Sequence, residues 1–375
     1  MEQTMKRLNH KVNPLRENIL PFTQPQVYGF LGHAYVRAIL ENYEECEAWL
    51  QNNYIQLYIS QHYIDMNEYR LDFLPDLLMI FANVPWLEYH RTDQKSLARL
   101  DVDIHHFIID HIDRGYYCFT YVNDFYIPHT LSYQKYQFTH DIFIFGYDLN
   151  RQLYHVAIFD DQRQFSMREL SFEDFDQAYH SETRQDYISM LRKVAPSEYD
   201  SYKYDMKIGH YDFDLELMVD MMDDYLHGRN TRERLRLYQN PEDGFYGMDI
   251  YKGLHQFFTL LYEDKINLDV RQLHLLWEHK KLMISRILYL QEQGYLEETK
   301  SLDAFRKIEK DIHMLRSMLL KYFIVQNKAI ITNIIHSLDE IYEVERAAII
   351  LLMDDICRKN KLRDYKSTVQ AAAEV

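Results

Sequence analysis

The feature that most constrains the fold is a group of three β-strand patterns near the middle of the chain. Aromatic and β-branched residues, which favour strands, fill Tyr116–Asn123, Asp141–Asp148 and Leu153–Asp160. Asp148 and Asn150 lie in the short segment between the last two ranges, and both residue types tolerate the tight conformations of a hairpin loop. The pattern therefore predicts an antiparallel hairpin within a central sheet.

Helical patterns surround these strands. Apolar residues recur at helical spacing between Ala34 and Leu50, and an amphipathic pattern covers residues 101–114. Near the end of the chain, residues 302–335 and 337–359 have the size of two antiparallel bundle helices. We therefore expect an α+β fold in which a central antiparallel sheet is followed by an all-helical region.

The chain has 375 residues, which exceeds one comfortable hydrophobic core, so two domains are expected. We place an α+β domain at residues 20–212 and a helical bundle domain at residues 213–365. Within the first domain, residues 31–100 are expected to be mainly helical. A capping-box pattern at Ser171 to Asp174 predicts the start of another helix.

The composition limits the partners and the compartment. With 58 acidic against 42 basic residues, the net charge of −16 disfavours binding to nucleic acids and anionic membranes. The three cysteines lie far apart and form no CxxC pair, which argues against a disulfide framework or a structural zinc site. The first 22 residues lack the apolar core of a secretory signal, and no apolar run reaches transmembrane length. We expect a soluble cytoplasmic protein.

Three segments of the strand region carry a resemblance to a known family. They are the run from Tyr116 to Pro128, the run from His140 to Asp148, and the run from Val156 to Asp161. In this order they resemble the N-terminal domain of the butirosin biosynthesis protein H family. That family looks like a branch of the papain-like superfamily related to double-glycine leader peptidases. The resemblance, which covers roughly residues 20–300, implies a papain-like cysteine-peptidase-type fold for the first domain.

The resemblance also implies a catalytic arrangement. In a cysteine acyltransferase a thiolate attacks the acyl carbonyl, an imidazole transfers the proton, and a carboxylate or amide orients the imidazole. His140, at the start of one strand, fits the imidazole, and Asp160, at the end of the next, fits the carboxylate. The nucleophile should stand at the start of the first long helix, where the sequence has Phe30. Cys118, on the preceding strand, is the remaining thiol that could approach His140.

Two functions follow as hypotheses. The first is a catalytically degenerate acyltransferase-like protein that acts as a binding or accessory component in secondary-metabolite biosynthesis of the nonribosomal peptide or aminoglycoside type. The second is an active acyl or aminoacyl transferase, or an amide hydrolase, that uses His140 and Asp160. In both cases the expected partner is an acyl-carrier protein or a small biosynthetic intermediate.

No cofactor or metal is expected. The sequence contains no glycine-rich phosphate loop, GxSxG elbow or HExxH motif. His105, His106, Asp110 and His111 form the densest group of metal-capable residues, and His106 and Asp110 would share a helix face. Two ligands on one helix do not complete a metal site, so the polar face of an amphipathic helix is the favoured interpretation.

Overall fold

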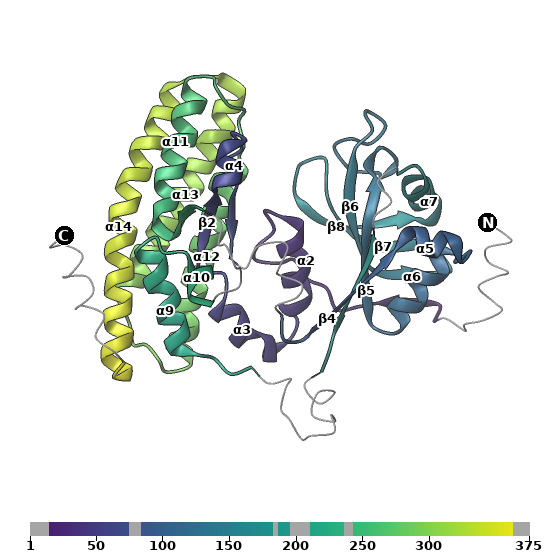
Figure 1. Cartoon of the computed structure of the whole chain (residues 1–375), viewed down its shortest axis with the longest axis horizontal. Coiled ribbons are helices and arrows are strands. Elements are labelled where there is room, and N and C mark those ends of the chain that lie inside the picture. Colours follow the sequence, from purple (N-terminus) through teal and green to yellow (C-terminus); the bar gives the residue numbers. More distant parts are fainter. Residues whose placement is uncertain (1–14, 75–83, 183–186, 196–210, 236–242, 363–375) are drawn as a thin grey trace. The chain divides into compact units, whose positions relative to one another are not determined.

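The computed structural model in Figure 1 describes residues 15–74, 84–182, 187–195, 211–235 and 243–362. It divides into two compact units. Unit 1 contains residues 1–46 and 78–210, and unit 2 contains residues 47–77 and 211–375. The sequence predicted one division near residue 212. The two compact units of the structure group residues 47–77 with the C-terminal half, so each unit is built from two separate parts of the chain.

Unit 1 contains a large antiparallel sheet. Among the described residues it has seven strands, in the order β4-β9-β5-β6-β7-β8, and β1 pairs with β6 beside this path. The strands are β1 (Glu17–Ile19), β4 (Leu87–Asp93), β5 (Tyr116–Asn123), β6 (Thr139–Asp148), β7 (Leu153–Phe159), β8 (Phe165–Ser171) and β9 (Tyr187–Lys193).

Helices cover both faces of this sheet (Figure 1). One face packs against α5 (Gln94–Arg99), α6 (Ile104–Asp113) and α7 (Phe172–His180), around a core that includes Cys118, Val122, Ile142 and Ile144. The other face carries aromatic rings and packs against α2 (Leu31–Leu40), where Tyr35 stacks on Phe143 with ring centroids 4.3 Å apart. Alternation along each strand separates these two cores.

The predicted hairpin is confirmed. β6 and β7 pair antiparallel, and the Asp148 carboxylate accepts hydrogen bonds from the backbone N–H groups of Asn150 and Arg151 in the turn. The helix start at Ser171 is confirmed as well, because its hydroxyl caps the backbone N–H of Asp174 at the start of α7.

Two expectations for residues 31–100 were wrong. The expected helix from Ala34 to Leu50 ends at Leu40, and the chain continues through the 3-10 turn η1 (Glu44–Cys46) into α3 (Glu47–Asn52), at the boundary between the units. The region is also not mainly helical, since it contains β2 (Leu57–Ser60), β3 (Leu71–Phe73) and β4. β2 and β3 are too short to give a clear periodic pattern in the sequence.

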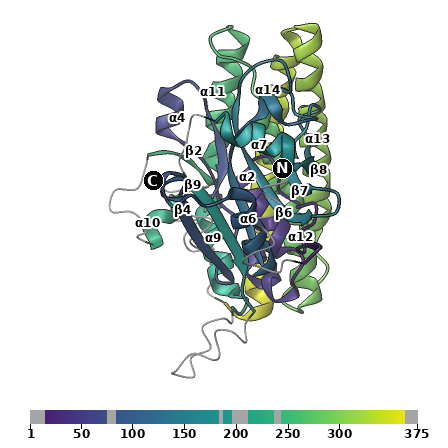
Figure 2. The ribbon, with the colours of Figure 1, turned by 90° about the vertical axis from the view of Figure 1, so that its right-hand side faces the viewer.

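Unit 2 is dominated by long helices that run beside one another (Figure 2). α12 packs on α13, which packs on α14, and α11 packs on α14. A small sheet in the order β10-β2-β3 lies in the same unit. The elements of unit 2 are α3, β2, α4 (Gln61–Asp65), β3, α9 (Leu215–Leu226), α10 (Thr231–Leu235), β10 (Gly244–Tyr246), η4 (Gly247–Asp249), α11 (Ile250–Tyr262), α12 (Arg271–Glu292), α13 (Lys300–Val325) and α14 (Ala329–Asn360).

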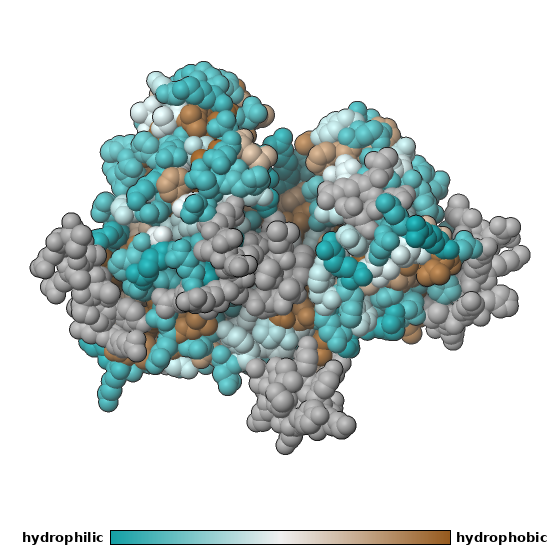
Figure 3. Space-filling model, in the orientation of Figure 1, coloured by the Kyte–Doolittle hydropathy of each residue, from teal (hydrophilic) through white to brown (hydrophobic). Residues whose placement is uncertain are grey.

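The surface of unit 2 is mostly hydrophilic in the view of Figure 3, where the helices turn their polar sides outward. Two long C-terminal helices are present as predicted, but their expected bounds, residues 302–335 and 337–359, were wrong: α13 ends at Val325 and α14 begins at Ala329, so the turn lies at residues 326–328. Within the part of the chain that the structure describes, no helix combines the length and the apolar character needed to cross a membrane.

A buried ion pair, together with two tyrosines, joins four helices of unit 2. Lys280 of α12 donates to Glu345 of α14 at 2.5 Å, and both side chains are fully buried. Tyr225 of α9 and Tyr251 of α11 donate to the same carboxylate at 3.0 and 2.6 Å. Each acceptor oxygen is therefore hydrogen-bonded, which a buried charge requires if it is not to destabilise the fold.

We predict that Glu345→Gln destabilises unit 2 by about 3 kcal/mol, because it leaves the Lys280 charge buried without its counter-charge. Glu340→Gln is the matched control on the same helix, since Glu340 is exposed and contacts only His336 at 3.5 Å among the described residues. Urea unfolding followed by circular dichroism at 222 nm measures both. Equal midpoints for the two variants would show that the pair contributes little.

Candidate functional site

The candidate site lies where β5 ends and β6 begins in unit 1. The antiparallel register pairs Val122 with His140 and Tyr121 with Asp141. His140 therefore has the same orientation as Val122, and Asp141 points to the opposite face of the sheet, where α2 packs. Both side chains are about one-quarter exposed, and His140 Nδ1 lies 3.9 Å from Asp141 Oδ1. The predicted position of His140 at the start of a strand is confirmed.

The helix α2 points its N-terminus toward this end of the sheet. Ala38, near its C-terminal end, accepts a hydrogen bond from the Thr23 backbone, and the adjacent Phe22 stacks on Phe145. One turn earlier, Tyr35 stacks on Phe143, which is closer to His140 along β6. Phe30 is the N-cap residue of α2, as the sequence predicted, and its side chain makes no capping hydrogen bond.

Tyr35 presents a buried hydroxyl to this end of the sheet. The side chain is fully buried, and its hydroxyl lies beside the Asp141 carboxylate without meeting hydrogen-bond geometry with any described residue. Burial, followed by the neighbouring carboxylates of Asp141 and Asp124, raises the pKa of Tyr35 well above its ordinary value. The hydroxyl is therefore protonated at neutral pH.

Asp124 is the second buried group. It opens the 3-10 turn η3 (Asp124–Tyr126), and its backbone N–H donates to the carbonyl of Phe138, which holds it beside the start of β6. The residue is 8% exposed, and burial raises the pKa of its carboxyl to about 6; His140 lowers this value and Asp141 raises it. Among the described residues, the Asp124 carboxylate accepts no hydrogen bond and forms no ion pair with Lys or Arg.

We call Tyr35, Asp124, His140 and Asp141 the sheet-end cluster. They come from α2, the β5–β6 connection and β6, so the register of the sheet and the packing of α2 bring them together. The sequence singled out His140 alone. Asp141 could have been noticed because it follows His140 on the predicted strand. The sequence pattern instead indicated that Tyr35 is a core residue and that Asp124 begins a loop.

Asp160 lies directly after β7, at the same end of the sheet. Continuing the β6–β7 register beyond the Phe143–Ala157 pair places Asp160 opposite His140. Its carboxylate accepts from the Gln162 and Gln164 backbone, at 3.0 and 2.9 Å, and from the Ser166 hydroxyl at 2.5 Å and Arg168 at 3.3 Å.

These four donors orient the Asp160 carboxylate toward its own turn. Burial would raise the pKa of Asp160, but the hydrogen bonds from Ser166, Gln164 and Gln162 outweigh it and hold the pKa below the ordinary value. Among the described residues, no hydrogen bond or ion pair joins Asp160 to His140. The structure thus places the two residues at one end of the hairpin and gives the carboxylate other partners.

Cys118 is not brought to His140. It pairs with Ile144 of β6 and Met190 of β9, whereas His140 pairs with Val122, four residues further along β5. Four strand residues span about 13 Å. Cys118 is fully buried in the core beneath α6, and burial raises the pKa of its thiol far above the ordinary value. Cys46 and Cys357 are buried as well.

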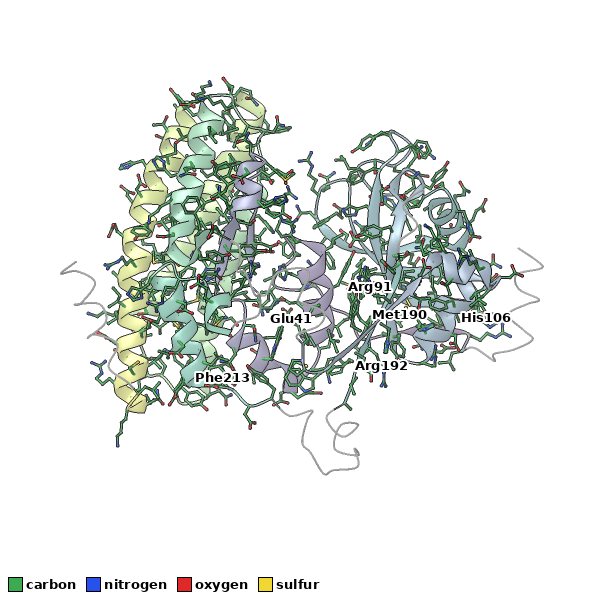
Figure 4. All side chains as sticks on the ribbon, viewed as in Figure 1. Glu41, Arg91, His106, Met190, Arg192 and Phe213 are labelled. Carbon is green, nitrogen blue, oxygen red and sulfur yellow. The ribbon has the colours of Figure 1, made fainter. Side chains whose placement is uncertain are left out.

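The histidines of α6 serve different purposes. His105 is buried, and its ring nitrogens lie 2.7 Å from the Tyr154 hydroxyl and 2.8 Å from Asp176 of α7, so it links α6, β7 and α7. His106 lies at the outer side of unit 1 (Figure 4). The described residues contain no group of three or more His, Cys, Asp or Glu side chains arranged to hold a metal ion.

No protein-family model matches the sequence, and no curated protein matches it.

We predict that Ellman's reagent labels almost none of the three thiols in the folded protein and all three in guanidinium chloride. The buried thiols have no contact with the reagent, and the raised pKa of Cys118 keeps it protonated. Rapid labelling that disappears in Cys118→Ala would contradict the buried position of this residue.

We also predict that Tyr35→Phe leaves the free energy of unfolding unchanged or raises it by about 1 kcal/mol, because it removes a buried hydroxyl without a hydrogen bond. Tyr154→Phe is the matched comparison in the same unit. It removes a buried hydroxyl that is bonded to His105, and should cost about 1 to 2 kcal/mol. Urea unfolding tests this, and equal losses in both variants would refute it.

Proposed function

We propose that unit 1 is an acyltransferase-like domain that has lost covalent catalysis and acts as a binding or accessory component in secondary-metabolite biosynthesis. Its partner is an acyl-carrier protein or a small biosynthetic intermediate. The papain-like character of the domain belongs to this proposal. It is supported by the resemblance of the strand segments and by the direction of α2, whose N-terminus points toward the end of β6 that begins with His140.

The observation that carries the proposal is the residue at the start of α2. A helix N-terminus stabilises a thiolate, so a nucleophilic cysteine belongs at this position in a papain-like domain. Phe30 is there instead, and all three thiols of the chain are buried elsewhere. The Tyr35 hydroxyl is a poor nucleophile because its raised pKa keeps it protonated.

The surroundings of Asp160 favour the same conclusion. A carboxylate that orients a catalytic imidazole must accept a hydrogen bond from it. The Asp160 oxygens instead accept from the turn between β7 and β8 and from Ser166 and Arg168. The alternative, an active transferase or amide hydrolase that uses His140 and Asp160, requires this carboxylate to exchange its partners.

We predict that the wild-type protein forms no acyl adduct and causes no thioester hydrolysis when it is incubated with an acyl N-acetylcysteamine thioester. The reason is that the thiols are buried and Phe30 cannot attack a carbonyl. Intact-protein mass spectrometry and release of the free thiol measure the two reactions. An adduct or a turnover that His140→Ala abolishes would establish the active enzyme instead.

The variant Phe30→Cys tests the arrangement itself. It places a thiol at the helix N-terminus that points toward the His140 end of β6, so it should gain an acyl mass increment, and Phe30→Cys/His140→Ala should gain it much more slowly. Leu31→Cys, one residue further into the helix, is the matched control for simple thiol exposure. Equal acylation of all three variants would contradict the papain-like arrangement.

A further inference from the structure

We infer that the end of unit 2 where α13 turns into α14 docks on the surface of an anionic lipid bilayer. The side chains that enter the lipid are exposed and apolar, and we call them the apolar tip: Leu320, Phe323, Ile324 and Val325 of α13 and Tyr262 of α11. The docking places these side chains in the lipid interface without a helix that crosses it. This attachment is independent of the function proposed for unit 1.

The first support is the exposure of the apolar tip. Ile324 is 80% exposed, and its neighbours Phe323 and Val325 are 59% and 49% exposed. Leu320, one turn earlier, is 40% exposed. Tyr262 is 44% exposed and belongs to the same end of the bundle, because Lys328 Nζ lies 5.3 Å from the centroid of its ring. Single exposed apolar residues are common, but a group of this size marks an interaction surface.

The exposure follows from the lengths of the helices. α13 and α14 are the longest helices that the structure describes, and they turn at one end of the bundle (Figure 1). Trp277 of α12 donates to Glu309 of α13 at 2.5 Å, and its ring lies 5.2 Å from that of His313. α12 begins at Arg271, so in this antiparallel pair it begins opposite about residue 317. About two turns of α13 therefore project beyond α12.

The second support is the charge around the apolar tip. The chain has 58 acidic residues, yet residues 312–338 contain none, and they contain Arg316, Lys321 and Lys328. Lys321 is exposed on α13 and forms no ion pair with the described residues, whereas Lys328 pairs with Asp264 at 2.5 Å. A protruding apolar group with lysines at its margin fits an anionic bilayer, because the apolar side chains enter the acyl boundary while the ammonium groups meet the phosphates.

The same charges decide between possible occupants. The net charge of −16 opposes the approach to an anionic surface. At physiological ionic strength the Debye length is about 8 Å, so the basic residues at the turn act on the headgroups, whereas carboxylates further away are largely screened. A second copy of the chain fits the apolar tip less well, because tip-to-tip packing brings Lys321 and Lys328 of both copies together.

Vesicle co-sedimentation of the full chain tests the docking. The protein should sediment with vesicles made of equal parts of phosphatidylglycerol and phosphatidylcholine. It should bind vesicles of phosphatidylcholine alone at least about fivefold more weakly, because the attraction between the lysines and the anionic headgroups is then absent. Failure to bind the anionic vesicles, or equal binding to both kinds, would overturn the inference.

The variant Ile324→Asp should weaken binding to the anionic vesicles by at least about tenfold, because it places a carboxylate where an apolar side chain enters the lipid. Leu288→Asp is the matched control: Leu288 is 44% exposed on α12, toward the opposite end of the bundle, so this variant adds the same charge away from the turn. Both side chains are exposed, so both variants should keep the circular dichroism spectrum of the wild type. Equal loss of binding in the two variants would contradict the assignment to the apolar tip.

The contribution of charge is measured at Lys321. Lys321→Gln should weaken binding to the anionic vesicles by about fivefold, whereas Lys307→Gln, further from the turn on the same helix, should leave it unchanged. Sedimentation velocity without vesicles examines the other occupant. A wild-type dimer that Ile324→Asp converts to a monomer would show that the apolar tip joins two copies of the chain, and it would overturn the inference.

Discussion

The antiparallel pairing of β5 with β6 positions every group of the candidate site in unit 1. Because side chains alternate along a strand, a slip of one residue would exchange the faces to which His140 and Asp141 point. Two cores hold the register: the aliphatic core beneath α6 and α7, and the aromatic core in which Tyr35 stacks on Phe143. The site is thus a consequence of how both faces of one sheet are filled.

The same packing keeps the thiol of β5 away from His140. The strand that could bring a thiol toward His140 instead commits Cys118 to the aliphatic core, four residues from the partner of His140. Burial raises the pKa of the Asp124 carboxyl to about 6, whereas Asp141 is partly exposed and lies 3.9 Å from His140.

Unit 2 satisfies its buried charges in the opposite way. Glu345 receives Lys280 and two tyrosine hydroxyls, so the carboxylate is bonded on both oxygens. This pattern ties α9, α11, α12 and α14 together and is typical of a structural network. At the sheet-end cluster of unit 1, by contrast, the Asp141 carboxylate has His140 at 3.9 Å as its ion-pair contact among the described residues.

The sequence by itself determined the hairpin, the helix start at Ser171, the long C-terminal helices and the position of Phe30 before the first long helix, because each depends on local periodicity or on one capping residue. It could not determine that residues 47–77 join unit 2, or that Tyr35 lies beside Asp141. Those facts depend on strand register and helix packing between distant segments. Local patterns carry no information about such contacts, so only the tertiary structure decided them.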